Sequence, residues 1–550
     1  MSRVLILGGG IAGMSAAMEL AADHDVTVLE RRPMAGGKAR TWVNPDYEVF
    51  QEHSFRVFHG TYENTFDTMR RVPTSEGRTI LDDLDPFVSR QDVQDTGAET
   101  FTRWLRSYVA GSIGTTEALR LAVDGARLLR ALTASDERLL RRYGDASFER
   151  LFLQRPAGDR GLLFQGLRDM SQVEYSSDRV NPDVKVMLNF VEKHFLHGFP
   201  GLAWRALVGP TSDTYIDPWR RHLEGLGVEF MTEHHAVGLT LSDGRIGEVA
   251  VRNPAGRVTP HYADHYVLAV PTDVLPDLVD RDLEHAASQL RRVRSVRRVW
   301  NNGVMIYTAK PTRVVGGFYL WHPWRVAVTS YAQRWREPFA RAMRSYGVGE
   351  DLGRIADVIS YVVTDWFADG IVTGKPASAC SPDEIYDELC WMGIEDRTVM
   401  PSFDPADHVH PLSVTGDRVR CLVDPALIYG GEGTIVANED TLAHLPPGYS
   451  LRMPGAATDV DNLYLAGCHC YNAFGCGDSM EGANETGRRA ANAILEREGS
   501  QRRAVIHEGR WKSPAVRALH VARGADRAAL MVTSALTGLL PGPVQRLVRR

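Results

Sequence analysis

The feature that most constrains the fold lies at the start of the chain, where a glycine-rich turn separates an apolar run from a helical pattern. The apolar run covers residues 4–7, and a second one, residues 26–29, ends in Glu30. This order predicts a strand, a tight turn, a helix and a second parallel strand, the unit that binds the diphosphate of a dinucleotide. Four residues of the turn, with the spacing G-x-G-x-x-G, are predicted to bind it: Gly8, Gly10, Ala12 and Gly13.

Each glycine of this turn has a separate physical role. Gly8 permits the tight turn, Gly10 lets the backbone approach the diphosphate, and Gly13 lets the helix pack closely on the strand. Glu30 is placed to accept hydrogen bonds from ribose hydroxyls, and Arg31 follows it in the predicted site. Because a carboxylate repels a 2′-phosphate, the pattern disfavours NADP.

The next glycines distinguish between dinucleotides. Gly36, Gly37 and Lys38 follow Glu30 in an E-x(5)-G-G-[KR] arrangement. Two glycines allow the backbone to pass close to a cofactor, and a cation here can offset the charge of its diphosphate. The arrangement resembles flavoproteins of the amine oxidase and carotenoid desaturase superfamily and not NAD-dependent dehydrogenases, so the resemblance implies FAD as the cofactor.

A second motif makes the resemblance more specific. Residues 52–64, EHSFRVFHGTYEN, resemble the E-x-G-x-H-x-F-x-G-x-Y-x-N segment of plant and cyanobacterial phytoene and zeta-carotene desaturases. Arg56 stands where that family has His, and Ser54 stands where it has Gly. The similarity resumes in five later segments: 189–194, 217–219, 263–271, 462–467 and 480–483. It implies six further cofactor-binding residues: Arg56, Val57, Val237, Gly467, Cys468 and Met480.

The scattered motifs predict an α/β fold in which a Rossmann-type FAD-binding domain is discontinuous and an α+β substrate domain is inserted into it. The predicted FAD-binding domain comprises residues 1–75, 215–290 and 450–497. The predicted substrate domain comprises residues 76–214 and 291–449. Within the first domain, Ser242-Asp243-Gly244 predicts a hairpin turn between two strands. The remaining residues, 498–550, form a basic amphipathic tail.

Cys468 departs from the resembled families, which usually have Asp after Leu-Ala-Gly. Three interpretations are open for this residue and its neighbours His469, Cys470 and Cys476. They could form a metal site, but C-H-C-x(5)-C matches no standard zinc spacing. Cys468 could be a reactive or flavin-linked thiol. We favour a small residue that replaces Asp at a tolerated cofactor contact, and we assign no metal site.

The resemblance implies an FAD-dependent oxidoreductase, a desaturase or dehydrogenase, that removes hydride from a hydrophobic, isoprenoid or carotenoid-like substrate. The alternative is a flavin amine oxidase, or a redox-neutral double-bond isomerase, acting on a different lipophilic substrate. Three departures keep the alternative open: Arg56, Cys468, and Thr214 at the position where plant-type phytoene desaturases carry an Arg that is implied to face the polyene. The sequence assigns no catalytic residue and no electron acceptor.

Composition limits the class of protein and its location. The formal charge of −6 over 550 residues, with no dominant basic domain, disfavours nucleic-acid binding. All six cysteines lie between Cys380 and Cys476, which is unlike a secreted disulfide framework and favours the reducing cytoplasm. No apolar run reaches the roughly 20 residues that span a bilayer. The sequence therefore predicts a cytoplasmic enzyme, with peripheral membrane contact as a further hypothesis.

That hypothesis comes from the basic tail. Residues 501–550 hold ten Arg or Lys residues and two acids. Arg517, His520, Arg523 and Arg527 recur at helical spacing and form one cationic face, while Ala518, Ala522, Ala525, Ala529, Val532 and Leu536 form a second stripe. Such a helix could lie on an anionic membrane surface, or it could pack against an acidic flank of the enzyme itself. The sequence leaves both interpretations open.

Overall fold

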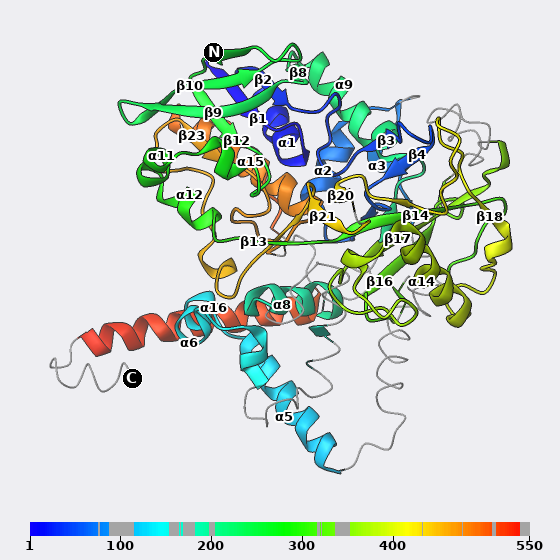
Figure 1. Cartoon of the computed structure of the whole chain (residues 1–550). Helices are drawn as coiled ribbons and strands as arrows, with labels where there is room; N and C mark the ends of the chain where they lie inside the picture. Colours follow the sequence, from blue (N-terminus) through cyan, green and yellow to red (C-terminus); the bar gives the residue numbers. More distant parts are fainter. Residues whose placement is uncertain are drawn as a thin grey trace.

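A parallel sheet forms the first layer of the molecule (Figure 1). The computed structural model describes residues 1–74, 77–86, 115–152, 164, 167–168, 182–196, 204–315, 319–320, 322–335, 353–431, 433–475, 477–508 and 513–538. The five strands have the order β23-β12-β1-β2-β8. Their bounds are β1 Arg3–Leu7, β2 Asp25–Glu30, β8 Glu229–Thr232, β12 His265–Leu268 and β23 Leu463–Leu465. Because three distant parts of the chain supply these strands, the prediction of a discontinuous Rossmann-type fold is confirmed.

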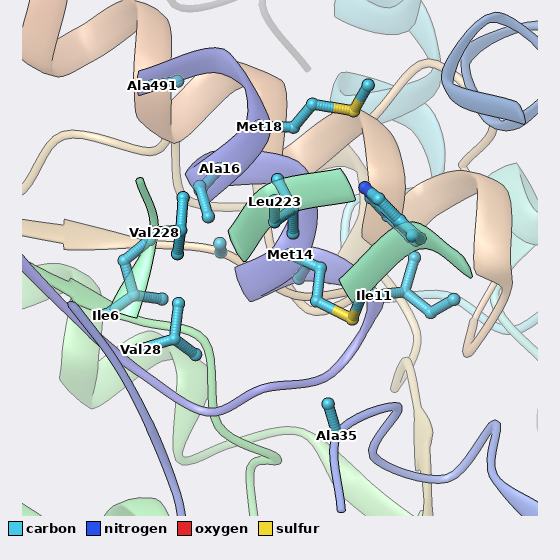
Figure 2. Packing of buried hydrophobic residues seen from close by; sticks show 14 of the residues in the cluster. Ile6, Ile11, Met14, Ala16, Met18, Val28, Ala35, Leu223, Val228 and Ala491 are labelled. Carbon is cyan, nitrogen blue, oxygen red and sulfur yellow. The ribbon is translucent and has the colours of Figure 1, made fainter. Parts of the chain in front are cut away.

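Helices α1 (Ile11–Leu20) and α15 (Met480–Arg497) pack against each other beside this sheet. Their backbones approach so closely at Gly487 that a Cβ there would lie 2.2 Å from the carbonyl oxygen of Ala12. Figure 2 shows the core around α1, where Ile6, Met14 and Val228 are buried among apolar neighbours. The helices α2 (Glu63–Arg71) and α9 (Asp217–Gly225) complete this layer.

Along the chain, a separate three-stranded antiparallel sheet lies between β8 and β12. Its strands are β9 (His235–Ser242), β10 (Arg245–Arg252) and β11 (Val258–His261). Asp243 and Gly244 join β9 to β10 with φ angles of 50° and 76°. Two consecutive left-handed residues are typical of a tight hairpin turn, so the hairpin predicted at Ser242-Asp243-Gly244 is confirmed.

The second layer is an antiparallel sheet that carries helix α14 (Pro382–Glu395) on one face, at the right of Figure 1. The sheet has the order β15-β16-β17-β14-β18, with β19 also paired to β14. Its bounds are β14 Asn302–Thr308, β15 Tyr319–Leu320, β16 Val326–Ser330, β17 Asp357–Val363, β18 His408–Val409 and β19 Leu422–Val423. This mixture of sheet and helix, inserted between β12 and β23, confirms the predicted inserted α+β region.

Helices dominate the lower part of the molecule in Figure 1. They are α5 (Thr115–Leu132), α6 (Asp136–Tyr143), α8 (Val184–Val191), the π-helix η3 (Glu192–Leu196) and α16 (Pro514–Gly538). Helix α16 contains part of the basic tail and packs on α6 and η3. None of the helices in the described ranges is long and apolar enough to cross a membrane.

The cationic face of α16 lies on an acidic flank of the enzyme. Arg523 binds Glu192 at 2.8 Å, and Arg527 binds Glu137 at 2.8 Å. Burial opposes ionisation of Glu192, but the hydrogen bond from His520 and the charge of Arg523 outweigh it and lower the pKa of Glu192. Of the two interpretations of the tail, the structure therefore shows packing on the protein for this face.

Most of the predicted second stripe of α16 is exposed. The buried side chains are Val516 and Leu519, whereas Ala518, Ala525 and Val532 are exposed. The ion pairs of Arg523 with Glu192 and of Arg527 with Glu137 hold the helix on the protein through its cationic face.

Short elements connect these layers. The strands are β3 Thr41–Val43, β4 Phe50–Glu52, β5 Val57–Phe58, β6 Asp85–Pro86, β7 Arg205–Ala206, β13 Arg297–Val299, β20 Leu427–Tyr429, β21 Ile435–Asn438 and β22 Leu442–His444. The helices are α3 Ile80–Asp83, η2 Phe148–Phe152, η4 Ser212–Ile216, α10 Leu275–Leu278, α11 Arg281–Ala286, α12 Ser288–Val293, η6 Ala377–Ala379, η7 Pro405–Asp407 and η8 Ser450–Arg452.

Candidate active site

One cavity of about 420 Å³ collects most of the residues predicted from sequence. It opens at the carboxyl ends of the parallel strands, where ligands bind in folds of this kind. Its walls include Gly8, Gly10, Ala12, Glu30, Arg31, Gly37, Lys38, Arg56, Val57, Gly467, Cys468 and Met480. Two predicted residues lie outside its described lining. Gly13 is buried behind the turn, and Val237 lies on β9, because that strand belongs to the separate antiparallel sheet.

The glycine turn at the end of β1 is as tight as its spacing requires. Gly8 has a φ of 111°, and a Cβ there would lie 2.5 Å from the carbonyl oxygen of Ala269. A Cβ on Gly13 would lie 2.0 Å from the carbonyl oxygen of Gly8. Only glycine at this position therefore lets the first turn of α1 pack this closely on the preceding turn. At Gly10, by contrast, the nearest atom to an added Cβ is Gly37 Cα at 3.8 Å. Gly10 therefore borders open space.

Glu30 is held rigidly at the end of β2. Its carboxylate accepts hydrogen bonds from the backbone N–H of Gly9 at 3.0 Å and of Arg32 at 2.9 Å. These contacts hold both oxygens of the carboxylate beside the turn, in the wall of the cavity. Binding of ribose hydroxyls by Glu30 stays a prediction.

The second pair of glycines runs alongside the first turn. Gly36 donates its N–H to the carbonyl of Gly9 at 2.8 Å, which brings Gly37 beside Gly10. The Lys38 ammonium contacts Asp478 at 3.1 Å. Burial disfavours the charged form of Lys38, but the Asp478 carboxylate outweighs it and raises the pKa of Lys38. The charge of Lys38, which the sequence assigned to a diphosphate, is thus already paired within the protein.

Arg56 brings a second positive charge to the cavity. Its guanidinium donates to Ser54 Oγ at 3.1 Å and to the carbonyl oxygen of Lys38. Its buried Nε has no hydrogen-bond partner among the residues that the structure describes. Burial lowers the pKa of Arg56, and the nearby Glu52 carboxylate opposes that shift. An unsatisfied buried donor in a cavity wall is a reason to expect a ligand there.

Cys468 is bound to the backbone beside the cavity. Its thiol donates to the Ser479 carbonyl at 3.1 Å and accepts from the Ser479 N–H at 3.3 Å. Burial raises the pKa of the Cys468 thiol, which keeps it protonated and disfavours the reactive-thiol interpretation. His469 is buried as well, and burial lowers its pKa to about 4.

The described side chains of this segment give a metal site no support. In the part of the chain that the structure describes, no group of three or more His, Cys, Asp or Glu side chains could hold a metal ion. Cys470 is buried in an apolar cluster, and Cys476 lies outside the described residues.

We expect Cys468→Ser to keep FAD and to change turnover by less than roughly tenfold, since both hydrogen bonds to Ser479 survive and one such bond contributes about 1 kcal/mol. FAD content from visible absorbance and steady-state turnover check this. Acid denaturation of the wild type should release the flavin. Flavin that stays with the polypeptide would show instead that the thiol is covalently linked to it.

The amino end of α15 completes the wall. Ser479 caps the helix by accepting the N–H of Gly482 at 3.0 Å, and Met480 lines the cavity. The next residue, Glu481, points away and accepts hydrogen bonds from Asn64 and Thr65 at 2.8–2.9 Å. An 18-residue helix thus directs the positive end of its dipole at the cavity.

The family to which the chain belongs is consistent with this geometry. The sequence pattern of the family described as "Flavin containing amine oxidoreductase" matches residues 11–305 and 438–495, and the chain belongs to that family.

Among individual proteins, the chain is similar to the zeta-carotene desaturase of Synechocystis sp., with 23% identity over 92% of this chain and 99% of that protein. It is 22% identical to the carotenoid phi-ring synthase of Chlorobaculum tepidum over 45% of this chain and 39% of that protein. A crystal structure of an oxidoreductase from Methanosarcina mazei, 13% identical, has a TM-score of 0.47 and covers 90% of this chain and 100% of that chain.

The protein is therefore an FAD-dependent oxidoreductase. The residues present fit that cofactor. Gly10 and Gly37 leave room at the helix terminus for a diphosphate, Glu30 stands beside the turn, and Arg56 has a buried donor to satisfy. The individual roles of these residues stay predictions.

The sequence reasoning missed several residues of the cavity. His53 lies inside the quoted motif, but it stands at a position where the motif specifies no residue type. The motif therefore gave no reason to select it. Trp204, Asn301 and Asp440 carried no local signal, because the fold alone brings them to the cavity. Asp478, which binds Lys38, was also overlooked.

Proposed function

We propose that this FAD-dependent oxidoreductase forms carbon–carbon double bonds in a hydrophobic isoprenoid polyene. The observation that carries the proposal is the alignment with the zeta-carotene desaturase of Synechocystis sp., which covers 99% of that protein, and hence both its FAD-binding and its substrate-binding parts. Short segments are more similar still: the probable zeta-carotene desaturase of Synechococcus elongatus is 40% identical over 14% of this chain and 15% of that protein.

The cavity supports an apolar substrate. Away from the glycine turn, its lining contains many apolar and aromatic side chains: Phe55, Val57, Tyr62, Trp204, Ala327 and Val362. Ala327 and Val362 come from β16 and β17, so the inserted sheet forms one wall and the nucleotide-binding layer forms the other. A polyene has no hydrogen-bonding groups, and its affinity must come from apolar contact of this kind.

The chain's own residues hold the cofactor, orient the substrate and stabilise charge in the cavity. FAD supplies the ring that accepts a hydride from the substrate. The Arg56 guanidinium and the amino end of α15 place positive charge at the cavity, which favours the arrival of negative charge there. The apolar wall excludes water from the reacting carbons.

Anaerobic mixing of the purified holoenzyme with zeta-carotene tests the proposal. We expect the visible absorbance of the flavin to fall as the polyene gains a double bond, with the new product identified by chromatography. Benzylamine and a polyamine serve as probes of the amine oxidase alternative. Bleaching by an amine and not by zeta-carotene would contradict the proposal, and a rearranged polyene without bleaching would indicate an isomerase.

We infer further that the enzyme works at a membrane surface, through apolar side chains of α5 and α16. Both helices lie on the side away from the parallel sheet (Figure 1). Their exposed apolar side chains are Leu119 (67%), Leu129 (58%), Val521 (74%), Met531 (62%) and Val532 (59%). A substrate that dissolves only in lipid needs such contact, and exposed apolar side chains on a helix can enter the interface.

Replacing Val521, Met531 and Val532 together with Gln should weaken binding to phosphatidylglycerol vesicles by roughly tenfold or more, since each buried apolar side chain contributes about 1.5 kcal/mol or more. Co-sedimentation measures the binding. Val258→Gln, on the exposed strand β11, is the matched control and should bind like the wild type. Because the contact is apolar, binding should persist at high salt. Equal sedimentation of the triple variant would rule out this surface.

A further inference from the structure

A buried histidine–carboxylate pair lies in the wall of the cavity. His53 follows β4, and Asp424 follows β19, 371 positions along the chain. His53 Nδ1 and Asp424 Oδ2 are 2.5 Å apart, and the two side chains are 7% and 1% exposed. His53 is one of the residues that line the cavity. The pair therefore joins the inserted sheet to the active site.

The surroundings of Asp424 fix the orientation of the ring. Asn302 Nδ2 donates to Asp424 Oδ2 at 3.1 Å, and the Ala426 N–H donates to Oδ1 at 3.0 Å. A carboxylate this deeply buried needs donors on its oxygens, and His53 supplies one through Nδ1–H. With Nδ1 occupied, Nε2 is the ring nitrogen that remains for the cavity.

The other charges near the pair are themselves paired. Asp440 binds Arg32 at 3.0 Å and Arg40 at 3.3 Å. Burial opposes ionisation of Asp440, but the two arginines outweigh it and lower its pKa, with His53 adding to the effect. On the other side, Arg56 lies within electrostatic reach of Asp424 and of Glu52. Asp424 is the acid that contacts the ring directly.

We propose that His53 accepts the proton when the substrate loses hydrogen, an inference that rests on the proposed function. Forming a double bond removes a hydride from one carbon and a proton from its neighbour. The hydride, with its two electrons, goes to FAD. The proton goes to the lone pair of His53 Nε2, and the electrons of that carbon–hydrogen bond become the new π bond. Asp424 stabilises the positively charged ring, which then releases the proton to solvent.

The test compares His53→Gln and Asp424→Asn with the wild-type holoenzyme. His53→Gln should keep FAD, and should keep binding of zeta-carotene as seen in the flavin spectrum, because neither depends on a base. Its single-turnover rate of flavin reduction should fall by roughly 100- to 10,000-fold, the usual contribution of a positioned base. Asp424→Asn should also slow this step, because an amide cannot stabilise the charged ring.

A further measurement separates a base from a structural residue. Added imidazole should restore part of the rate to His53→Gly. His265, which pairs with Glu498 at 2.9 Å and does not line the cavity, supplies the control: His265→Gln should behave like the wild type.

Equal reduction rates in His53→Gln and the wild type would overturn the inference and leave the proposed function intact. A wild-type flavin that zeta-carotene does not reduce would overturn both. If His53→Gln loses its FAD, Asp424→Asn decides: an unchanged rate in that variant would overturn the inference, and a slowed rate with bound FAD would support it.

Discussion

Gly10→Val should yield a folded protein that has lost its yellow FAD. Gly10 has a φ of −80° and a ψ of −177°, a backbone conformation that valine adopts readily. A Cβ there meets nothing closer than Gly37 Cα at 3.8 Å, so the apoprotein accepts the side chain. The same side chain fills the space that the glycine leaves for the diphosphate. We expect the affinity for FAD to fall by roughly 100-fold or more, equivalent to about 2.8 kcal/mol.

Gly13→Ala is the informative control, because it should fail for a different reason. Its Cβ would lie 2.0 Å from the carbonyl oxygen of Gly8, so α1 and β1 must move apart before any cofactor binds. Circular dichroism and flavin absorbance separate the two outcomes: Gly10→Val keeps its secondary structure and loses colour, whereas Gly13→Ala loses stability. A yellow, fully active Gly10→Val protein would contradict a cofactor site at this turn.

Arg488→Met should lower the free energy of unfolding by about 3–5 kcal/mol, the usual cost of removing one partner of a buried charge pair. The Arg488 side chain is fully buried in α15. It binds Asp67 at 2.9 Å and donates to Thr68 Oγ1 at 2.7 Å and to the Asn64 carbonyl at 3.0 Å. Methionine fills the volume but removes the charge and the donors of Arg488 from this buried site.

The same helix supplies a surface control for this experiment. Arg497 pairs with Asp461 at 2.6 Å, and both side chains are about half exposed. Because an exposed ion pair contributes about 0–1 kcal/mol, Arg497→Met should unfold close to the wild type in urea. Flavin release and circular dichroism should report the same midpoint shift in Arg488→Met. A shift no larger than that of Arg497→Met would show that Arg488 does not connect α15 to α2.

The segment 52–64 illustrates how much a motif can predict. The residue types of this motif and its place in the chain indicated a cofactor contact. The structure places Arg56 and Val57 of the motif in the cavity. Other members of the motif have a different purpose. Asn64 binds Glu481 through its backbone N–H and its side-chain amide, which ties α2 to the start of α15. The sequence could not separate these roles, because a motif shows residue types and their spacing but not what each side chain contacts.

The basic tail illustrates the opposite case. Its cationic face was visible in the sequence, but the partner of that face was not, because Glu137 and Glu192 lie more than three hundred residues earlier. Helical periodicity shows that a helix has two faces, and only packing decides which face is covered. Here ion pairs bind Arg523 and Arg527 to the protein, and Val521 and Val532 stay exposed.

The sequence by itself determined the glycine turn, the parallel strands around it and the flavoprotein family. These depend on contiguous residues, since the requirements of a strand, a tight turn and a helix terminus are met within about thirty positions. Tertiary structure alone decided that Lys38 binds Asp478, that Cys468 binds the backbone of Ser479, and that His53 meets Asp424. The Lys38 and His53 pairs join distant segments, and the order of strands in the two sheets, which no local pattern encodes, brings them together. The Cys468 contact is closer in the chain, but it depends on the fold of the loop that precedes α15.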